Sequence, residues 1–205
     1  MSGPKRAALL LAAGLSSRMG QPKALLPWNG EPLVAFQVRQ LRAAGADPIV
    51  VVVGAEAERV GAAVPPLPAV RVVANPDFER GRSTSIRAGA AALPEGVGVL
   101  LVQSVDQPCV AAVQARLYEV AERSGAPVVV PTYQGRRGHP IALAGWVVPE
   151  LADLSEERQG LREVVQRYRD RTVEVPVEWE GVLWNLNRPE DYEAARRAFH
   201  AWRHR

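Results

Sequence analysis

The sequence is poor in several features that would place it in a particular class of protein. It has one cysteine, Cys109, among 205 residues, so no disulfide can form within the chain. No stretch reaches the roughly 18 apolar residues of a membrane-spanning helix, and the apolar run in MSGPKRAALLLAAG is too short to favour a signal peptide. The net charge of +3 is too small to indicate nucleic acid as a partner. We therefore expect a reduced, cytoplasmic protein without a membrane or nucleic-acid partner.

Several catalytic and cofactor signatures are missing as well. There is no G-x-x-x-x-G-K-[ST] loop and no G-x-G-x-x-G fingerprint, which argues against a P-loop enzyme and an NAD-linked dehydrogenase. The HAWRH run near the end lacks the glutamate of a zinc-protease helix. No histidine lies close in sequence to Cys109, which we interpret as a small buried hydrophobic residue.

The chain alternates between two patterns, and its hydrophobic content of 47% is enough for a sizeable core. Short apolar runs, typical of strands buried on both faces, occur at Ala7–Ala12, Pro48–Val53, Val70–Ala74, Val97–Val102 and Pro127–Val130. Helical patterns occur at Leu33–Ala44, Ser83–Leu93, Val110–Arg123, Leu161–Arg169 and after Asn187. This order predicts an α/β protein with a mostly parallel sheet covered on both faces. Ligands in such folds bind at the carboxyl ends of the strands.

The region from Tyr133 to Glu180 departs from this alternation. It contains a turn rich in glycine and arginine, a Trp-Val-Val run and an acidic stretch. We expect it to form an extension that covers the open edge of the ligand site.

The loop after the first apolar run is the most informative segment. It reads LAAGLSSRMGQPK, and Gly14 and Gly20 allow tight turns and a close approach of backbone to a ligand. The freed backbone N–H groups of such a loop can surround an anion. Arg18 adds a planar guanidinium that fits phosphate oxygens, and Lys23 adds a compact positive charge. The loop therefore predicts a site for a polyphosphate.

Two further motifs also follow predicted strands. In LLVQSVDQP, Asp106 ends an apolar run, where a lone carboxylate beside phosphates suits Mg²⁺; the alternative is a cap for the helix that follows. In NPDFERGRSTSIRAG, backbone, hydroxyl and guanidinium donors gather at a helix start, where they suit an anion or the edge of a base, or serve as a helix cap. The donors of this third motif are Gly81, Ser83, Ser85 and Arg87.

The last two motifs lie in the second half of the chain. GRRGHPIAL places two arginines and His139 on a turn, where they either grip an acidic second substrate or form a solvated basic turn. LWNLNRPEDY places Asn185 and Asn187 before the final helix, where an amide oxygen either completes a Mg²⁺ shell or caps the helix.

The order of these motifs resembles the MobA-like nucleotidyltransferases over nearly the whole chain. The opening LAAGLSSRMGQPKALLPWNG is similar to the signature of that superfamily, and the GHP turn resembles the molybdenum cofactor cytidylyltransferase branch. LAAG, in place of the LAGG common in the guanylyltransferase branch, favours CTP over GTP. The resemblance implies a Rossmann-like three-layer fold of the nucleotide-diphospho-sugar transferase type. It also implies Mg²⁺ as cofactor and transfer of CMP to the phosphate of molybdopterin, with a molybdoenzyme as the receiver of the product.

By position, the resemblance also implies the roles of individual residues. Residues 1–205 would form one domain, with the nucleotide held by about residues 1–110 and the acceptor by about residues 111–205. Arg18, Lys23 and Asp106 would be catalytic, and Asp106 and Asn187 would hold the metal. The nucleotide would contact Leu11, Ala12, Ala13, Gly14, Ser16, Ser17, Arg18, Lys23, Gly81, Ser83 and Ser85. The acceptor would contact Arg137, Gly138, His139 and Pro140.

Two positions depart from the family's pattern. Arg188 occupies a place that is often threonine, so the start of the last helix needs another stabilising group. Asn185 and Asn187 stand where aspartate is common, which leaves either of them, or neither, as the second metal ligand. The alternatives in function are transfer of GMP, transfer to a sugar or alcohol phosphate, and a non-catalytic carrier of molybdenum cofactor.

Overall fold

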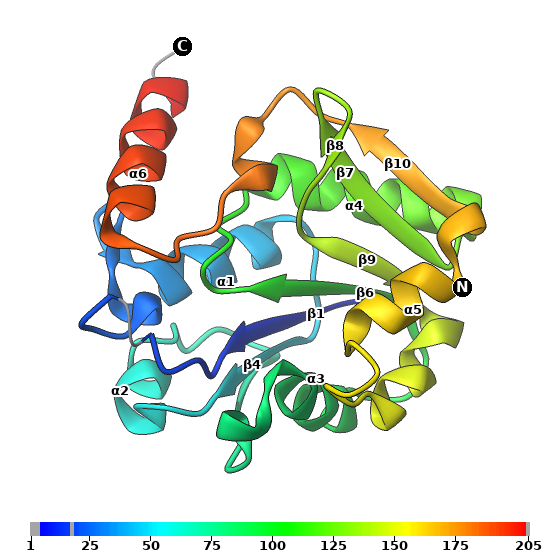
Figure 1. Ribbon diagram of the computed structural model, residues 1–205, viewed down its shortest axis with the longest axis horizontal. Coiled ribbons are helices and arrows are strands. Elements are labelled where there is room, and N and C mark those ends of the chain that lie inside the picture. Colours follow the sequence, from blue (N-terminus) through cyan, green and yellow to red (C-terminus); the bar gives the residue numbers. More distant parts are fainter. Residues whose placement is uncertain (1–4, 17–18, 204–205) are drawn as a thin grey trace.

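The centre of the protein is one mixed sheet. In the computed structural model, which describes residues 5–16 and 19–203, eight strands form this sheet (Figure 1). Its order is β10–β7–β9–β6–β1–β4–β5, and β8 pairs with β7. β9 runs antiparallel to both β6 and β7, β8 runs antiparallel to β7, and the other pairs are parallel. The strands are β1 (Lys5–Ala12), β4 (Ile49–Val53), β5 (Val70–Ala74), β6 (Val97–Ser104), β7 (Val128–Tyr133), β8 (Arg136–Arg137), β9 (Ile141–Ala144) and β10 (Thr172–Pro176). The prediction of a mostly parallel sheet is confirmed.

Helices cover both faces of this sheet. Alternate residues of β1 belong to different core clusters, Leu10 on one face and Leu9 on the other, and both are fully buried. The first face packs against α1 (Leu33–Ala43) and α4 (Ala111–Ser124), and the second against α3 (Arg82–Ala91) and α5 (Leu161–Arg167). α6 (Pro189–Arg203) joins the first cluster through Trp28 and through Phe36 of α1. The three-layer architecture expected from the alternation is therefore confirmed. No helix within the described ranges is long and apolar enough to cross a membrane.

Short elements that the sequence patterns did not reveal complete the fold. α2 (Ala57–Ala62) follows β4, and a hairpin of β2 (Pro27–Trp28) and β3 (Glu31–Pro32) leads into α1. The single-turn and irregular helices are η1 (Lys23–Leu25), η2 (Phe78–Arg80), η3 (Gly145–Asp153), η4 (Arg169–Arg171) and η5 (Glu180–Leu183). Cys109 is fully buried in the core, and burial raises the pKa of its thiol, which confirms its interpretation as a small hydrophobic residue.

The segment from Tyr133 to Glu180 differs from its expected role. Instead of forming only a cover, it supplies β9, which pairs with β6 and β7 in the interior of the sheet, and β10 at the edge. The short apolar run Ile141–Ala144 becomes an inner strand because the turn before it reverses the chain beside β7. The loop between η3 and α5 reaches the ligand edge, where it contacts the start of α3, and His139 of the turn before β9 lies within electrostatic range of Asp106.

The registers of the strands place four loops at one edge of the sheet. Ala12 pairs with Val53, Leu11 pairs with Ser104, and Val53 pairs with Ala74. Because these parallel strands end at the same level, the loops that follow them lie side by side. The loops after β1 and β6 are the ones that carry the first two sequence motifs.

Candidate functional site

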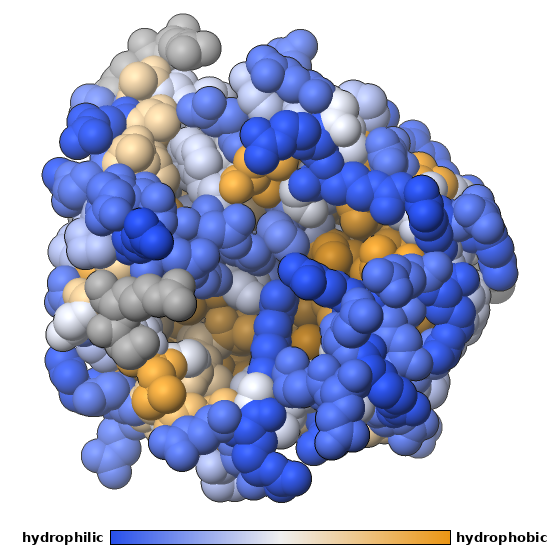
Figure 2. All heavy atoms as spheres, viewed as in Figure 1, coloured by the Kyte–Doolittle hydropathy of each residue, from blue (hydrophilic) through white to orange (hydrophobic). Residues whose placement is uncertain are grey.

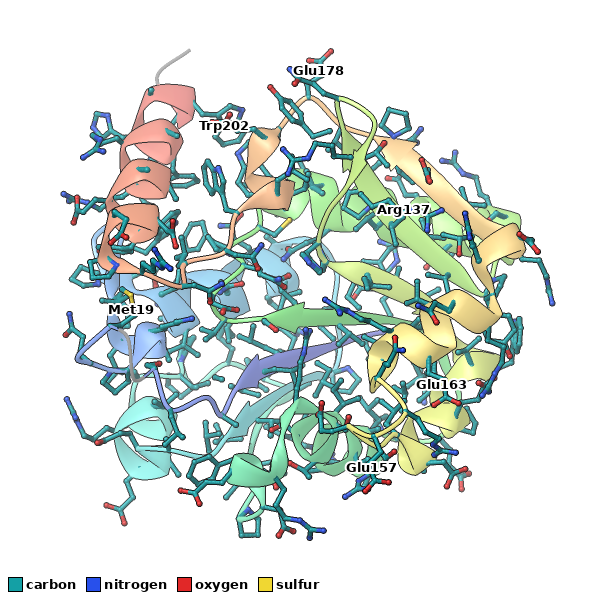
Figure 3. The ribbon with its side chains drawn as sticks, viewed as in Figure 1. Met19, Arg137, Glu157, Glu163, Glu178 and Trp202 are labelled. Carbon is teal, nitrogen blue, oxygen red and sulfur yellow. The ribbon has the colours of Figure 1, made fainter. Side chains whose placement is uncertain are left out.

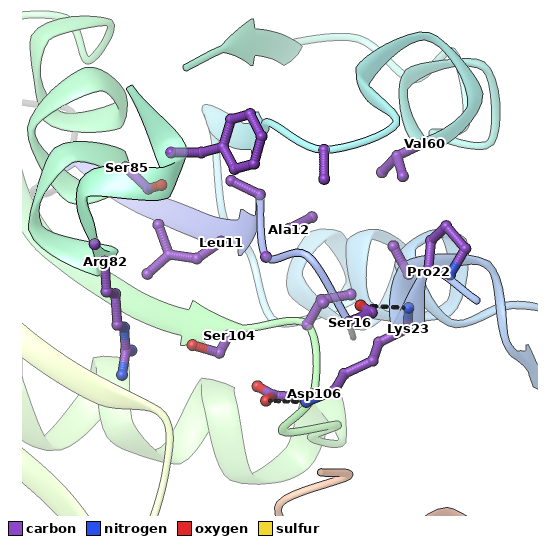
Figure 4. A pocket seen from close by; sticks show the side chains of 17 residues that line it. Leu11, Ala12, Ser16, Pro22, Lys23, Val60, Arg82, Ser85, Ser104 and Asp106 are labelled. Atoms are coloured by element: carbon purple, nitrogen blue, oxygen red, sulfur yellow. Dashed lines mark hydrogen bonds and ion pairs between the residues drawn. The ribbon is translucent and has the colours of Figure 1, made fainter. Parts of the chain in front are cut away.

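A pocket of about 250 Å³ lies at this edge, between the ends of β1 and β6 and the start of α3 (Figure 4). Figure 2 shows this face of the molecule hollowed, with apolar side chains visible between hydrophilic rims. Predicted site residues supply much of the wall. Those that line the pocket are Leu11, Ala12, Ala13, Gly14, Ser16, Lys23, Gly81, Ser85 and Asp106.

The loop after β1 forms one wall of the pocket. Ser16 has a left-handed backbone with φ of 52°, and its carbonyl accepts a hydrogen bond from the N–H of Met19 at 2.9 Å. Its Oγ accepts a second bond, from the backbone N–H of Lys23 at 3.0 Å. The loop is thereby folded back so that Lys23 begins η1 directly beside the pocket (Figure 4). Ser17 and Arg18, which the sequence places in this site, lie outside the described residues.

Lys23 joins the two halves of the chain at the mouth of the pocket. Its Nζ donates to Asp106 Oδ2 at 3.0 Å and to Asn187 Oδ1 at 2.8 Å. The side chains of Lys23 and Asp106 are 14% and 24% exposed, so this ion pair is shielded from much of the solvent but open to a ligand. Three residues from motifs spread over more than 160 positions of the sequence therefore meet at one point, since Lys23 and Asp106 are 83 positions apart and Lys23 and Asn187 are 164 apart.

The same two oxygens suit a small divalent cation. Mg²⁺ is usually held by one or two protein carboxylates together with substrate phosphates and water. The carboxylate of Asp106 and the amide oxygen of Asn187 make such a sparse set. Among residues 5–16 and 19–203, no group of three or more His, Cys, Asp or Glu side chains could hold a metal ion by itself. The residues therefore fit a cation that is bound jointly with a phosphorylated substrate.

Other contacts decide between the alternative roles of Asp106, Asn185 and Asn187. The backbone N–H of Ala111 at the start of α4 donates to Gln40 Oε1 at 2.9 Å, so Asp106 is free from that capping role. Asn185 Oδ1 accepts from Gln107 Nε2 at 2.7 Å, which fixes the loop, whereas Asn187 points to Lys23.

The start of α6 has its own stabilising group. The Asp191 carboxylate accepts a hydrogen bond from the N–H of Arg188 at 3.0 Å. This bond is the carboxylate half of a capping box: it satisfies the N–H of the residue before the helix, whereas a threonine at that position would accept from an N–H of the first turn.

The start of α3 contributes a cation that the sequence analysis missed. Arg82 lines the pocket, and its side chain points across it toward the end of β6 (Figure 4). It makes no hydrogen bond or ion pair with the described residues, and the walls of the pocket lower its pKa by desolvation. Arg87, which was named instead, donates to the Leu154 carbonyl at 3.2 Å on the outer side of the helix. The helix begins at Arg82, one residue before the predicted start at Ser83, and the orientation of the helix places Arg82 at the pocket.

The hydroxyl groups of α3 do not cap the helix as expected. The N-cap is Gly81, with no side-chain hydrogen bond, and the N–H of Ser83 donates to the Glu156 carboxylate at 2.5 Å. Ser83 is buried against the loop before α5 and does not line the pocket, whereas Ser85 does. The carboxylate of Glu156 therefore occupies the helix start, where the sequence predicted a bound anion.

The GHP turn lies against η5. Gly138 is buried, and a Cβ there would lie 2.4 Å from the Val182 carbonyl oxygen. That same oxygen accepts a hydrogen bond from the N–H of His139 at 2.8 Å. Burial, and then the charge of Arg82, lowers the pKa of His139 to about 4, against an opposing effect of Asp106. His139 is thus a neutral imidazole within electrostatic range of the pocket.

The remaining two residues of this motif are placed differently. Pro140 is buried, and Arg137 is exposed and paired with Glu174 of β10 at 2.7 Å. Figure 3 shows Arg137 between β8 and β10, away from the ends of β1 and β6. The turn therefore brings only its histidine toward Asp106.

Comparison with known proteins places this site in a family. The sequence matches the MobA-like NTP transferase domain over residues 8–173. A probable molybdenum cofactor guanylyltransferase of Opitutus terrae is 35% identical over 199 residues, which are 93% of this chain and 95% of that protein. A 2-C-methyl-D-erythritol 4-phosphate cytidylyltransferase of Streptomyces avermitilis is 33% identical over 174 residues, 80% of this chain and 68% of that protein. The nicotine blue oxidoreductase of Paenarthrobacter nicotinovorans is 33% identical over 162 residues, 75% of this chain and 78% of that protein.

Solved structures with a similar fold were also found. Rv0371c from Mycobacterium tuberculosis H37Rv superposes with a TM-score of 0.83 at 26% identity, over 96% of this chain and all of that one. A second structure of Rv0371c is a complex with manganese, with a TM-score of 0.79 at 25% identity over the same share of both chains. The family match spans residues 8–173, and a relative is alike over almost its whole length. The chain therefore belongs to the MobA-like NTP transferase family and is a nucleotidyltransferase.

Proposed function

We propose that this nucleotidyltransferase moves CMP from CTP to the terminal phosphate of a molybdopterin-type cofactor, with release of pyrophosphate. The observation that carries the proposal is the position of Lys23, whose ammonium is held between Asp106 and Asn187 at the mouth of the pocket. Positive charge is favoured at this point, directly beside a glycine-containing loop that suits a polyphosphate. The Opitutus terrae relative and the GHP turn support a molybdenum cofactor as acceptor.

The reaction needs neither a protein nucleophile nor a large proton transfer. An anionic oxygen of the acceptor phosphate forms a bond to the α-phosphorus of CTP. The bond from that phosphorus to the oxygen bridging the β-phosphate breaks, and pyrophosphate leaves with the electron pair. The protein contributes alignment and neutralisation of charge, and the described residues that line the pocket form no catalytic triad.

Each part of the site has a role in this scheme. The backbone of residues 12–16, with Gly81 and Ser85, would hold the nucleotide. Lys23 and Arg18 would neutralise the charge that grows on pyrophosphate. Asp106 and Asn187 would hold Mg²⁺, which when bound supplies charge stabilisation to phosphate oxygens. A neutral His139 would hydrogen-bond the acceptor without changing its own charge.

The relatives also favour a second nucleotide. The Opitutus terrae protein is named for guanylyl transfer, and the LAAG sequence that favours CTP differs from the common guanylyltransferase pattern by one residue. The Streptomyces avermitilis protein shows that an alcohol phosphate is another acceptor class among the relatives. These alternatives share the first half of the site and differ in the base or in the acceptor.

The deciding assay measures pyrophosphate release with Mg²⁺ and each nucleoside triphosphate, in the presence of molybdenum cofactor, of a sugar or alcohol phosphate, or of no acceptor. Release that requires both CTP and the cofactor supports the proposal. Release with GTP instead of CTP would indicate guanylyl transfer. Release only with a sugar or alcohol phosphate would show that this compound, and not molybdenum cofactor, is the acceptor. Binding of the cofactor without release from any nucleotide favours a carrier.

The metal ligand can be tested in the same assay. We expect Asp106→Asn to lower the rate of pyrophosphate release by about 10²- to 10³-fold, because the carboxylate that would hold Mg²⁺ beside the reacting phosphates becomes a neutral amide. The matched control is Asp47→Asn, which removes an exposed carboxylate that is paired with Arg42 before β4. Wild-type rates in the Asp106 variant would remove this residue from the reaction.

A further inference from the structure

Three glutamine side chains are fully buried in the otherwise apolar layer between the sheet and the helices α1 and α4. They are Gln37 of α1, Gln103 of β6 and Gln114 of α4, each with no exposed surface. An amide in such surroundings costs free energy unless its polar atoms are hydrogen-bonded. Apolar side chains of similar volume would fill the same space without this cost. The structure therefore raises the question of what these amides hold.

Two of them, Gln37 and Gln103, hold the two carbonyl groups on either side of Asp106. Gln37 Nε2 donates to the Val105 carbonyl at 2.5 Å, and Gln103 Nε2 donates to the Gln107 carbonyl at 3.3 Å. Gln103 also donates to Gln37 Oε1, so the two amides support each other. The backbone on both sides of Asp106 is thus held by one side chain of α1 and one of β6.

Gln114 stands one step further away. Its Nε2 donates to Gln103 Oε1 at 2.8 Å, and it makes no bond to the turn that carries Asp106. Its own Oε1 is buried without a partner in the described structure. Gln114 therefore shares the burial and the chemistry of Gln103 but lacks the contact with the turn, which makes it a matched control.

The front of the same turn is held by the loop before α6. The Asp106 carbonyl accepts a hydrogen bond from the N–H of Leu186 at 2.8 Å, and Gln107 Nε2 donates to Asn185. The three carbonyl groups of residues 105–107 are thus all hydrogen-bonded, two to the buried glutamines and one to the loop before α6. Such a turn has little freedom to move the Asp106 carboxylate away from Lys23 and Asn187.

We propose that Gln103, supported by Gln37, is a positioning residue that fixes the Asp106 turn so that its carboxylate and Asn187 stay at the separation needed for the metal and phosphates. The metal-binding part of this inference rests on the proposed function. The part that concerns the rigidity of the turn does not, because it follows from the hydrogen bonds of the protein alone. Gln103 acts through Asp106 and touches no substrate.

The test compares Gln103→Met with Gln114→Met. Both substitutions keep the approximate volume and remove one buried amide. Gln103→Met removes the bonds to Gln37, Gln107 and Gln114, whereas Gln114→Met removes only the bond to Gln103, so the first is expected to lower thermal stability more. Only the first frees the Gln107 carbonyl. Hydrogen exchange of the Val105 and Gln107 amides, followed by NMR, should be at least tenfold faster in Gln103→Met and within about twofold of wild type in Gln114→Met.

The second readout is metal affinity. Manganese binding in the presence of a non-hydrolysable CTP analogue, measured by electron paramagnetic resonance, should be at least tenfold weaker in Gln103→Met and unchanged in Gln114→Met. Gln37→Met should act in the same direction, and the double variant should show less than the sum of the single effects because both residues hold one turn.

The outcomes separate this inference from the proposed function. Equal amide exchange in the two methionine variants would overturn the positioning role whether or not the metal binds. Faster exchange in Gln103→Met with unchanged manganese affinity would overturn the link to the metal. If wild type itself bound no manganese with the nucleotide analogue, the proposed function would fail, while the exchange data would still decide whether Gln103 fixes the turn.

Discussion

Removing the Lys23 charge should strengthen the binding of a divalent cation to the nucleotide-free protein. In the structure the ammonium of Lys23 occupies the two oxygens, on Asp106 and Asn187, that would otherwise face the metal. A cation can therefore enter only after Lys23 has moved, and nucleotide phosphates are the group that would draw it away. Lys23→Met keeps the length of the side chain and removes this competition.

The size of the effect follows from the geometry of the ion pair. Two unit charges at about 4 Å attract by ~4 kcal/mol at the effective dielectric of a site near the surface. Desolvation offsets much of this, and charge-assisted hydrogen bonds of partly exposed groups contribute about 1–2 kcal/mol net. Each 1.4 kcal/mol corresponds to about tenfold in affinity. We expect manganese to bind about 5- to 30-fold more tightly to nucleotide-free Lys23→Met than to wild type.

The assay is a manganese titration followed by electron paramagnetic resonance, without nucleotide and then with a saturating CTP analogue. The nucleotide should tighten manganese binding in wild type and have a smaller effect in the variant, because only wild type has a lysine to displace. Arg39→Met is the control for net charge, since Arg39 forms an exposed pair with Glu31 on the surface.

The reasoning has one clear failure. If Lys23→Met binds manganese no better than wild type without nucleotide, the ammonium and the metal do not compete for the same oxygens. The assignment of Asp106 and Asn187 as the metal ligands would then be wrong, even if Lys23 remained essential for turnover.

Two predictions concern the GHP turn. Gly138→Ala should lower the free energy of unfolding by about 1–3 kcal/mol, since its Cβ would lie 2.4 Å from a backbone oxygen; urea unfolding would show this, with Gly61→Ala, whose Cβ meets only a methyl group at 3.6 Å, as the tolerated control. His139 has a folded-state pKa of about 4, below its ordinary value of 6.5, so the stability it allows is present near neutral pH and is lost as the pH falls from about 6.5 toward 4. Wild type should therefore lose roughly 1–2 kcal/mol more than His139→Gln between pH 7 and pH 5, and equal losses in the two proteins would show that the histidine is not held neutral.

Much of the sheet could be predicted because its parallel strands are buried on both faces. Such strands appear in the sequence as short apolar runs, and the polar residues after β1 and β6 then had to meet at one edge. Lys23 and Asp106 were found in this way. β9 could not be predicted as an inner strand, since its four residues carry no signal of which neighbours they will pair with.

The details of the site depended on positions that differ by only a few residues. Asn185 and Asn187 have the same chemistry in sequence, and only the hydrogen bond from Gln107 shows that the first of them is occupied in holding the loop. Arg82 and Arg87 lie on the same helix, and its orientation sends one into the pocket and the other to Leu154. The sequence pattern predicts that one residue of each pair lies at the site. The packing of elements far apart in the sequence determines which one it is.

The segment from Val182 to Asn187 has a consequence for protein engineering. It accepts the hydrogen bond of the GHP turn at Val182, meets the Asp106 turn at Leu186 and Asn185, and ends at Asn187. The part of the chain expected to choose the acceptor and the part expected to hold the nucleotide are therefore fitted to one shared strip of backbone. A chimera that exchanges the GHP turn between relatives should function only if residues 182–187 are transferred with it, which makes this strip the unit by which new acceptors could be introduced.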